Sequence, residues 1–183
     1  LKFDPSCQVD LVKDGALPHI IQPLANWGNL QNDAAESARQ RTLAAFALAA
    51  TCYKYPQAQT ECIRQNLHGR CVALLATFSK MDDQYQEQMK LFQQQQQLPK
   101  TRGQMPVPRP DPIHLQLMSS TDRVWLCLCL ANMVQKCPPA QREAYNVNMH
   151  ICLLARLRDD DPHVRAAAVY ALGCLLEYAP DVP

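Results

Sequence analysis

Thiols and imidazoles are the side chains of this sequence with the greatest capacity for catalysis or metal binding. The 183 residues include nine cysteines and five histidines. The closest cysteine pair is Cys127 and Cys129, and residues two positions apart on a helix point to nearly opposite sides, so this pair cannot converge on one ion. The odd count and the apolar surroundings predict reduced thiols that serve as small core residues, which implies a reducing compartment.

Two histidines lie close to a cysteine and could form a thiol–imidazole pair. His68 precedes Cys71, and His150 precedes Cys152. The first pair lacks an evident acid to orient the imidazole, and the second diverges on a helix. Because the sequence also lacks a glycine-rich phosphate loop and a Gly-x-Ser-x-Gly turn, we expect no enzyme, no cofactor and no metal site. An enzyme with Cys71 or Cys152 as its nucleophile is the alternative hypothesis.

Three consecutive carboxylates, Asp159, Asp160 and Asp161, could hold a cation. The oxygen ligands that a calcium loop requires do not follow at the right spacing. Asp161 precedes Pro162, and this order is typical of the N-cap and the first position of a helix. The sequence therefore predicts that Asp161 caps a helix and that the other two carboxylates lie in a solvated turn.

Composition narrows the class of partner. A net charge of +1 and a pI near 7.7 argue against nucleic acid and against an anionic membrane surface. No stretch approaches the roughly 18 uninterrupted apolar residues of a membrane-spanning helix, so direct membrane insertion is not expected. The chain begins at Leu1 without a methionine, and we expect it to be a segment of a longer protein.

A nine-residue pattern occurs three times and indicates stacked helices. Its copies, residues 41–49, 123–131 and 165–173, open on arginine, place leucine at the eighth position and end on a small residue. The last two start 42 positions apart (165 − 123), within the period of roughly 40–47 residues of armadillo and HEAT repeats. We expect an all-α fold, a right-handed superhelical armadillo/HEAT-type solenoid of antiparallel helix pairs. Arg41, Arg123 and Arg165 should bind the acidic turn of a neighbouring repeat.

Helix and linker signals divide the chain. Expected helices include residues 33–55, ended by Pro56, and residues 141–158, joined by a turn to a helix that starts at Pro162. We expect repeats of one solenoid over residues 1–81 and 113–183, and a largely flexible Gln/Pro-rich insertion over residues 82–112. Residues 105–110 of this insertion are either part of a spacer or a ligand for a proline-reading module.

Two segments resemble the Raptor family, the regulatory-associated proteins of the TOR (target of rapamycin) kinase. Residues 4–15 read Asp-Pro-Ser-Cys-Gln-Val-Asp-Leu-Val-Lys-Asp-Gly, and residues 161–173 read Asp-Pro-His-Val-Arg-Ala-Ala-Ala-Val-Tyr-Ala-Leu-Gly. Similar elements bracket part of the family's central armadillo-like solenoid, in the same order. The resemblance covers the chain except for about residues 82–119 and implies a non-catalytic scaffold.

The resemblance also implies partners and a location. Family members bind the TOR kinase, present substrates that carry a TOS motif, and dock on Rag-type GTPases, in the cytoplasm and at the lysosomal or vacuolar surface. Rag-type contacts of the family lie on the solenoid, so Gln135, Asp161, His163 and Arg165 are candidates for partner contact, with helix capping and stacking as the alternative. An armadillo or HEAT adaptor of another complex, such as a transport receptor or phosphatase scaffold, is the competing hypothesis for the function.

Overall fold

The computed structural model describes residues 5–25, 34–97, 108–111 and 118–177, and this part of the chain contains helices and no strand. The helices are α1 (Pro5–Lys13), α2 (Leu17–Ala25), α3 (Ala34–Cys52), α4 (Pro56–Arg64), α5 (Leu67–Gln97), α7 (Ser120–Val134), α8 (Pro138–Asn146), α9 (Met149–Arg156) and α10 (Pro162–Leu176). The prediction of an all-α repeat solenoid is confirmed.

Three helices form each repeat unit. The first is nine residues long and begins at a proline, Pro5, Pro56 or Pro138, where the missing N–H costs no helical hydrogen bond. We call α1, α2 and α3 unit 1, α4, α5 and α7 unit 2, and α8, α9 and α10 unit 3. The predicted pairs of helices are therefore each preceded by a short helix that the nine-residue pattern did not reveal.

A left-handed residue separates the first and second helices of every unit. Gly15, Asn66 and Asn148 have φ angles of 68°, 54° and 59°, and each lies ten positions after the proline of its unit (15 − 5, 66 − 56, 148 − 138). Glycine and asparagine adopt this conformation most readily, and a right-handed helix cannot continue through it. The prediction of one helix over residues 141–158 is therefore wrong, because the chain turns at Asn148.

Pro56 also has a different place from the one expected. The helix α3 ends at Cys52, and Lys54 then adopts a left-handed conformation with φ of 54°. Pro56 begins α4 instead of ending α3. Lys136 and Pro138 repeat this arrangement between α7 and α8, again with φ of 54° at the lysine.

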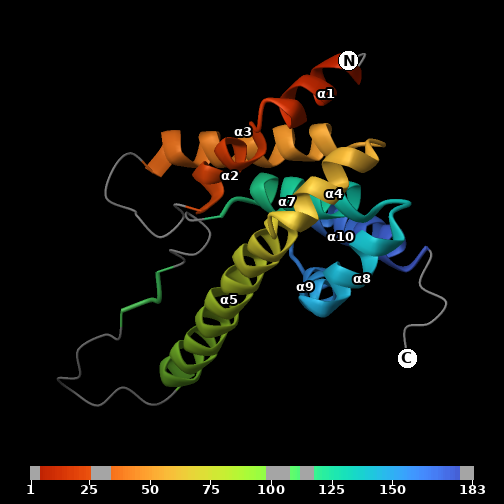
Figure 1. Ribbon diagram of the computed structural model, residues 1–183. Helices are drawn as coiled ribbons and strands as arrows, with labels where there is room; N and C mark the ends of the chain where they lie inside the picture. The colour runs from red at the N-terminus through yellow and green to blue at the C-terminus, as the bar shows by residue number, and fades with distance from the viewer. Residues whose placement is uncertain (1–4, 26–33, 98–107, 112–117, 178–183) are drawn as a thin grey trace.

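The third helices of the units lie side by side in the order α3, α7, α10 (Figure 1). They carry the three copies of the nine-residue pattern, and the leucines Leu48 and Leu130 in the first two copies are fully buried. Phe46 and Trp125 pack edge to face between α3 and α7, with ring centroids 4.8 Å apart. The shared sequence pattern thus marks one row of equivalent helices in the solenoid.

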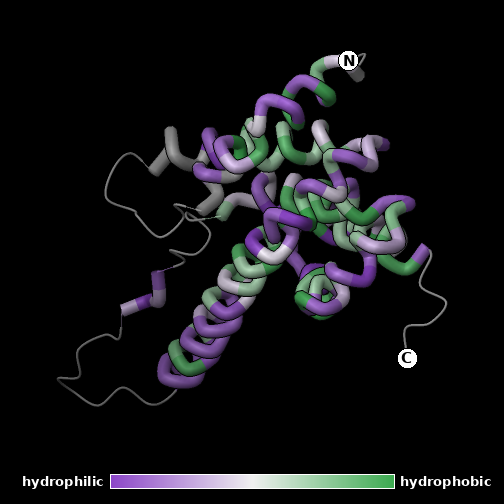
Figure 2. The backbone as a smooth tube through the Cα atoms, viewed as in Figure 1, coloured by the Kyte–Doolittle hydropathy of each residue, from purple (hydrophilic) through white to green (hydrophobic). Residues whose placement is uncertain are grey.

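The helix α5 is much longer than its counterparts α2 and α9. Its first half packs in the solenoid, and its second half, up to Gln97, extends away from the other helices (Figure 1) and is mostly hydrophilic (Figure 2). Residues 82–97 of the predicted insertion are thus the end of a helix, whereas residues 98–107 lie outside the described part. Among the described helices, none combines the length and apolar character needed to cross a membrane.

Candidate functional site

A buried ion pair joins unit 2 to unit 3. Nε and Nη2 of Arg123, in the first turns of α7, donate to the two carboxylate oxygens of Asp159 at 2.8 and 2.9 Å. Asp159 lies in the turn between α9 and α10, and both side chains are almost fully buried. This two-point geometry is the strong form of an arginine–carboxylate contact. For Arg123 it confirms the prediction that the arginine of the pattern binds the acidic turn of the neighbouring unit.

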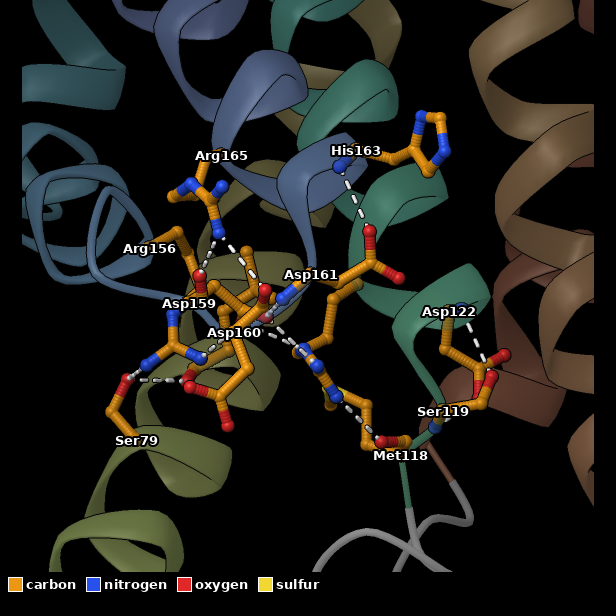
Figure 3. A network of polar contacts seen from close by, with 12 residues as sticks. Ser79, Met118, Ser119, Asp122, Arg156, Asp159, Asp160, Asp161, His163 and Arg165 are labelled. Carbon is orange, nitrogen blue, oxygen red and sulfur yellow. Dashed lines mark hydrogen bonds and ion pairs between the residues drawn. The ribbon is translucent and has the colours of Figure 1, made fainter.

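Two further helices contribute to the same junction (Figure 3). Arg156 of α9 donates to Asp159 at 3.2 Å and to the hydroxyl of Ser79 in α5 at 2.6 Å. The guanidinium groups of Arg123 and Arg156 lie 4.4 and 5.1 Å from the centre of the Phe78 ring, within the range of cation–π attraction. Two buried cations therefore share one carboxylate and one aromatic ring, which ties α5, α7 and α9 together.

Helix caps fix the ends of α7 and α10 at this junction. Ser119 and Asp122 form a capping box, in which each side chain accepts a hydrogen bond from the other residue's backbone N–H, at 3.2 and 3.0 Å. Asp161 caps α10 by accepting a bond from the N–H of His163 at 2.8 Å, as predicted. Asp159, predicted to lie in a solvated turn, is instead buried. That prediction was wrong because its counter-ion lies 36 positions earlier in the sequence.

A glutamine in each short helix clamps the third helix of its unit. Gln8 donates to the carbonyls of Ala50 and Tyr53 at 2.8 and 3.1 Å. Gln59 donates to the carbonyls of Asn132 and Gln135 at 2.7 and 2.9 Å, and Gln141 donates to that of Cys174 at 2.8 Å. The carbonyls at a helix C-terminus lack intrahelical partners, so these buried amides satisfy them and hold the unit together.

Sequence reasoning missed the three glutamines, although a signal was present. Each glutamine is the fourth residue of its helix, three positions after the proline: Pro5 and Gln8, Pro56 and Gln59, Pro138 and Gln141. The nine-residue pattern lies in the third helices and is apolar, whereas these glutamines are polar and lie in the first helices, so apolar periodicity does not reveal them.

Eight of the nine cysteines are buried in the core, and Cys7 of α1 is exposed. Cys52 of α3 and Cys62 of α4 place their sulfurs 3.3 Å apart, and neither is exposed. Contact with Cys62 and burial raise the pKa of Cys52 well above its usual value. Burial raises the pKa of Cys152, the hypothetical nucleophile, to about 11, which disfavours the reactive thiolate. In the described part of the chain no group of three His, Cys, Asp or Glu residues is placed to hold a metal ion.

Three of the four candidate partner-contact residues lie together at the start of α10. The ring of His163 is exposed, and the carboxylate of Asp161 is engaged in capping, which lowers its pKa. Nη1 of Arg165 donates to the carbonyls of Asp159 and Asp160 at 2.7 and 2.9 Å. Unlike Arg123, Arg165 thus binds the turn of its own unit.

The fourth candidate, Gln135, lies elsewhere. It follows the last residue of α7, and its amide donates to the hydroxyl of Tyr170 in α10 at 3.1 Å. Tyr170 is seven positions beyond His163 and lies near the middle of α10, so Gln135 is about two helical turns away from the other three candidates.

The units are stacked, and the buried polar groups between units 2 and 3 are paired with one another. This arrangement defines a helical-repeat protein of the armadillo/HEAT class. Residues 152–179 match the HEAT repeat family.

Comparison with curated proteins narrows this class. The chain is 32% identical over 177 residues to regulatory-associated protein of TOR 1 of Arabidopsis thaliana, covering 97% of the chain and 10% of that relative. It is 30% identical over 176 residues to the protein raptor homolog of Dictyostelium discoideum, covering 96% of the chain and 8% of the relative. It is 23% identical over 178 residues to target of rapamycin complex 1 subunit mip1 of Schizosaccharomyces pombe, covering 97% of the chain and 10% of that relative.

The chain is therefore similar over nearly its whole length to Raptor-type proteins, which confirms the resemblance predicted from the two motifs. It spans about a tenth of the length of these relatives.

Proposed function

We propose that this chain is a non-catalytic scaffold segment of a Raptor-like subunit of a rapamycin-sensitive TOR complex. The observation that carries the proposal is the alignment of 97% of the chain with regulatory-associated protein of TOR 1. The geometry supports it, because the buried polar groups of the junction, Arg123, Arg156 and Asp159, are engaged with one another. A solenoid of this kind works through its outer surface.

Association with the TOR kinase tests this proposal. The full-length protein that carries this segment, tagged and purified under gentle lysis, should bring the TOR kinase with it. Recovery of a transport receptor cargo or a phosphatase in place of the kinase would favour an adaptor of another complex, and a clean absence of the kinase would reject the proposal.

Substrate recruitment through TOS motifs, and docking on Rag-type GTPases at the lysosomal or vacuolar surface, are the finer parts of the proposed function. For Rag-type docking we propose contacts at Asp161, His163 and Arg165 at the start of α10, and at Gln135, whose amide contacts Tyr170 near the middle of this helix. His163 supports this best, because its ring is exposed and lies in no buried network.

A surface variant separates docking from assembly. His163→Glu should reduce co-precipitation of Rag-type GTPases from cells while the TOR kinase is retained. Arg142→Glu, on the exposed side of α8, is the matched control and should change neither. Equal recovery of the GTPases with both variants would remove His163 from the interface.

A further inference from the structure

The second half of α5 carries an apolar stripe beside which none of the other described helices lies (Figure 1). The stripe consists of four side chains at intervals of four, four and three positions: Met81, Tyr85, Met89 and Phe92. This spacing places them on one face of a helix, and all four retain part of their surface exposed. An apolar row on an otherwise hydrophilic helix (Figure 2) indicates a surface for contact with another element.

The stripe continues the line along which the first half of α5 packs in the solenoid. Aromatic or thiol side chains recur on this line every seven positions: Cys71, Phe78, Tyr85 and Phe92. Seven residues make about two helical turns, so these side chains point in nearly the same direction. Cys71 and Phe78, in the first half, are buried against neighbouring helices. The second half thus presents the same kind of surface that packs in the first.

The positions beside the stripe indicate what kind of partner fits it. Five of the six are glutamine, and one is aspartate: Gln84, Gln86, Gln88, Gln93, Gln95 and Asp82. In paired helices the charges beside the apolar seam select the partner. A glutamine amide both donates and accepts hydrogen bonds, so two copies of this helix match each other without like-charge repulsion. A helix with charged flanks would instead place its charges against neutral amides.

The charged residues of the same segment lie on the opposite side of the helix. Lys80, Asp83, Glu87 and Lys90 are exposed, and the helical period places all four away from the stripe. Pairing through the stripe therefore leaves these charges in water, where they cost no desolvation. The segment is apolar and uncharged on the face that would pair and charged on the face that would remain in solvent.

The solenoid decides the orientation of such a pair. Two parallel helices would bring the bulky first halves of α5, with their solenoids, side by side, whereas two antiparallel helices place the solenoids at opposite ends. The overlap from Met81 to Gln97 spans 16 positions (97 − 81), about 24 Å of helix. A two-fold axis near Met89 then sets Tyr85 of each copy opposite Phe92 of the other, which forms two aromatic pairs.

The size of this contact predicts its strength. A strip about 24 Å long and about 10 Å wide offers a few hundred Å² per helix, less than the roughly 800 Å² per partner of a standard interface. The pairing should therefore be weak for free copies and become effective where two copies are held close to each other.

We propose that the second half of α5 is a self-association element, in which the stripe of Met81, Tyr85, Met89 and Phe92 packs antiparallel against the same stripe of a second copy of this chain. This contact adds to the proposed scaffold function and does not depend on it.

Photo-cross-linking of the full-length protein tests the occupant. The protein is prepared in a normal and a heavy-nitrogen form, each with a photo-cross-linker in place of Gln88, and the two forms are mixed. Linked peptide pairs that combine both isotopes should join position 88 to residues 81–97, at least several-fold more often than with the cross-linker at Glu87 on the opposite face. Links within one chain, links to another protein, or equal yields from the two positions would overturn the proposal.

Charge complementation tests the antiparallel register. Phe92→Glu in both copies should reduce the link between copies several-fold, and so should Tyr85→Lys in both copies, because each places like charges in the apolar contact. A mixture of Phe92→Glu with Tyr85→Lys should restore the link, since the two new charges then face each other. Failure to restore it would reject this register.

A control on the other face separates the stripe from general effects of charge. Lys90→Glu, at an exposed position outside the stripe, should leave the link unchanged, and a loss equal to that of Phe92→Glu would remove the stripe from the contact. Recovery of the TOR kinase with the full-length protein should be the same for both variants, so this result can be distinguished from the test of the scaffold function.

Discussion

The guanidinium of Arg123 and the carboxylate of Asp159 meet through two hydrogen bonds of 2.8 and 2.9 Å although the residues are 36 positions apart. Their burial makes the pair sensitive to loss of one partner, because the other charge then remains unpaired in the core. Asp159→Asn should lower the free energy of unfolding by about 3–5 kcal/mol, measured by denaturant titration with circular dichroism. Asp160→Asn, at the exposed neighbouring position, should have little effect.

Removing the opposite partner should be less harmful. Arg123→Met leaves Asp159 with a second cation, Arg156, at 3.2 Å, so its cost should be smaller than that of Asp159→Asn in the same titration. A larger loss for Arg123→Met would show that the shared carboxylate is not the centre of the junction.

The glutamine clamp predicts a position-specific loss of stability. Gln59→Met removes two hydrogen bonds to the carbonyls of Asn132 and Gln135 and should cost about 1–3 kcal/mol, since each buried bond contributes about 1 kcal/mol and its carbonyl is left without a partner. Gln57→Met lies on the exposed side of the same helix and should be nearly neutral. Equal midpoints in denaturant for the two variants would rule out the clamp.

His68 should make stability depend on pH. The side chain is only 3% exposed, both ring nitrogens lack a hydrogen-bond partner, and burial lowers its pKa below the usual value near 6.5, against an opposing effect of Glu143. The unfolded chain therefore binds a proton more readily than the folded chain does, so stability is fully present above about pH 6.5 and is lost as the pH falls.

Thermal unfolding between pH 5 and 8 checks this. His68→Leu should flatten the decline in the melting temperature on the acid side, while His163→Leu, at an exposed position, should keep it. If the melting temperature declined with the same slope in both variants, the pH dependence of stability would come from groups other than His68.

Thiol labelling tests the enzyme alternative. Cys7 is exposed and the other eight cysteines are buried, and burial raises the pKa of Cys127 to about 12. We expect one thiol per chain to react rapidly with iodoacetamide under native conditions, and Cys7→Ser to abolish that fast phase. Rapid labelling of Cys71 or Cys152 in the native protein would revive a catalytic cysteine.

The sequence allowed the row of third helices to be predicted, because the arginine, leucine and small residue of each copy recur at fixed positions within a helix. It did not allow the break at Asn148 to be predicted, since apolar periodicity continues across a single left-handed residue. Three adjacent carboxylates are typical of a solvated surface turn, and this local pattern therefore predicted an exposed Asp159. Its burial depends on Arg123 and Arg156, and a pairing that depends on tertiary structure is not visible in a local window.

The units differ in length at one point only. From the proline of the first helix to the arginine of the third helix, units 1, 2 and 3 span 36, 67 and 27 positions (41 − 5, 123 − 56, 165 − 138). The surplus in unit 2 falls in the second half of α5 and in the connection from α5 to α7. Both ends of that connection are anchored, at Ser79 by Arg156 and at Met118 by Arg123. The contacts that join unit 2 to unit 3 at Ser79 and Met118 thus lie outside the connection, and a change in its length is expected to leave them intact.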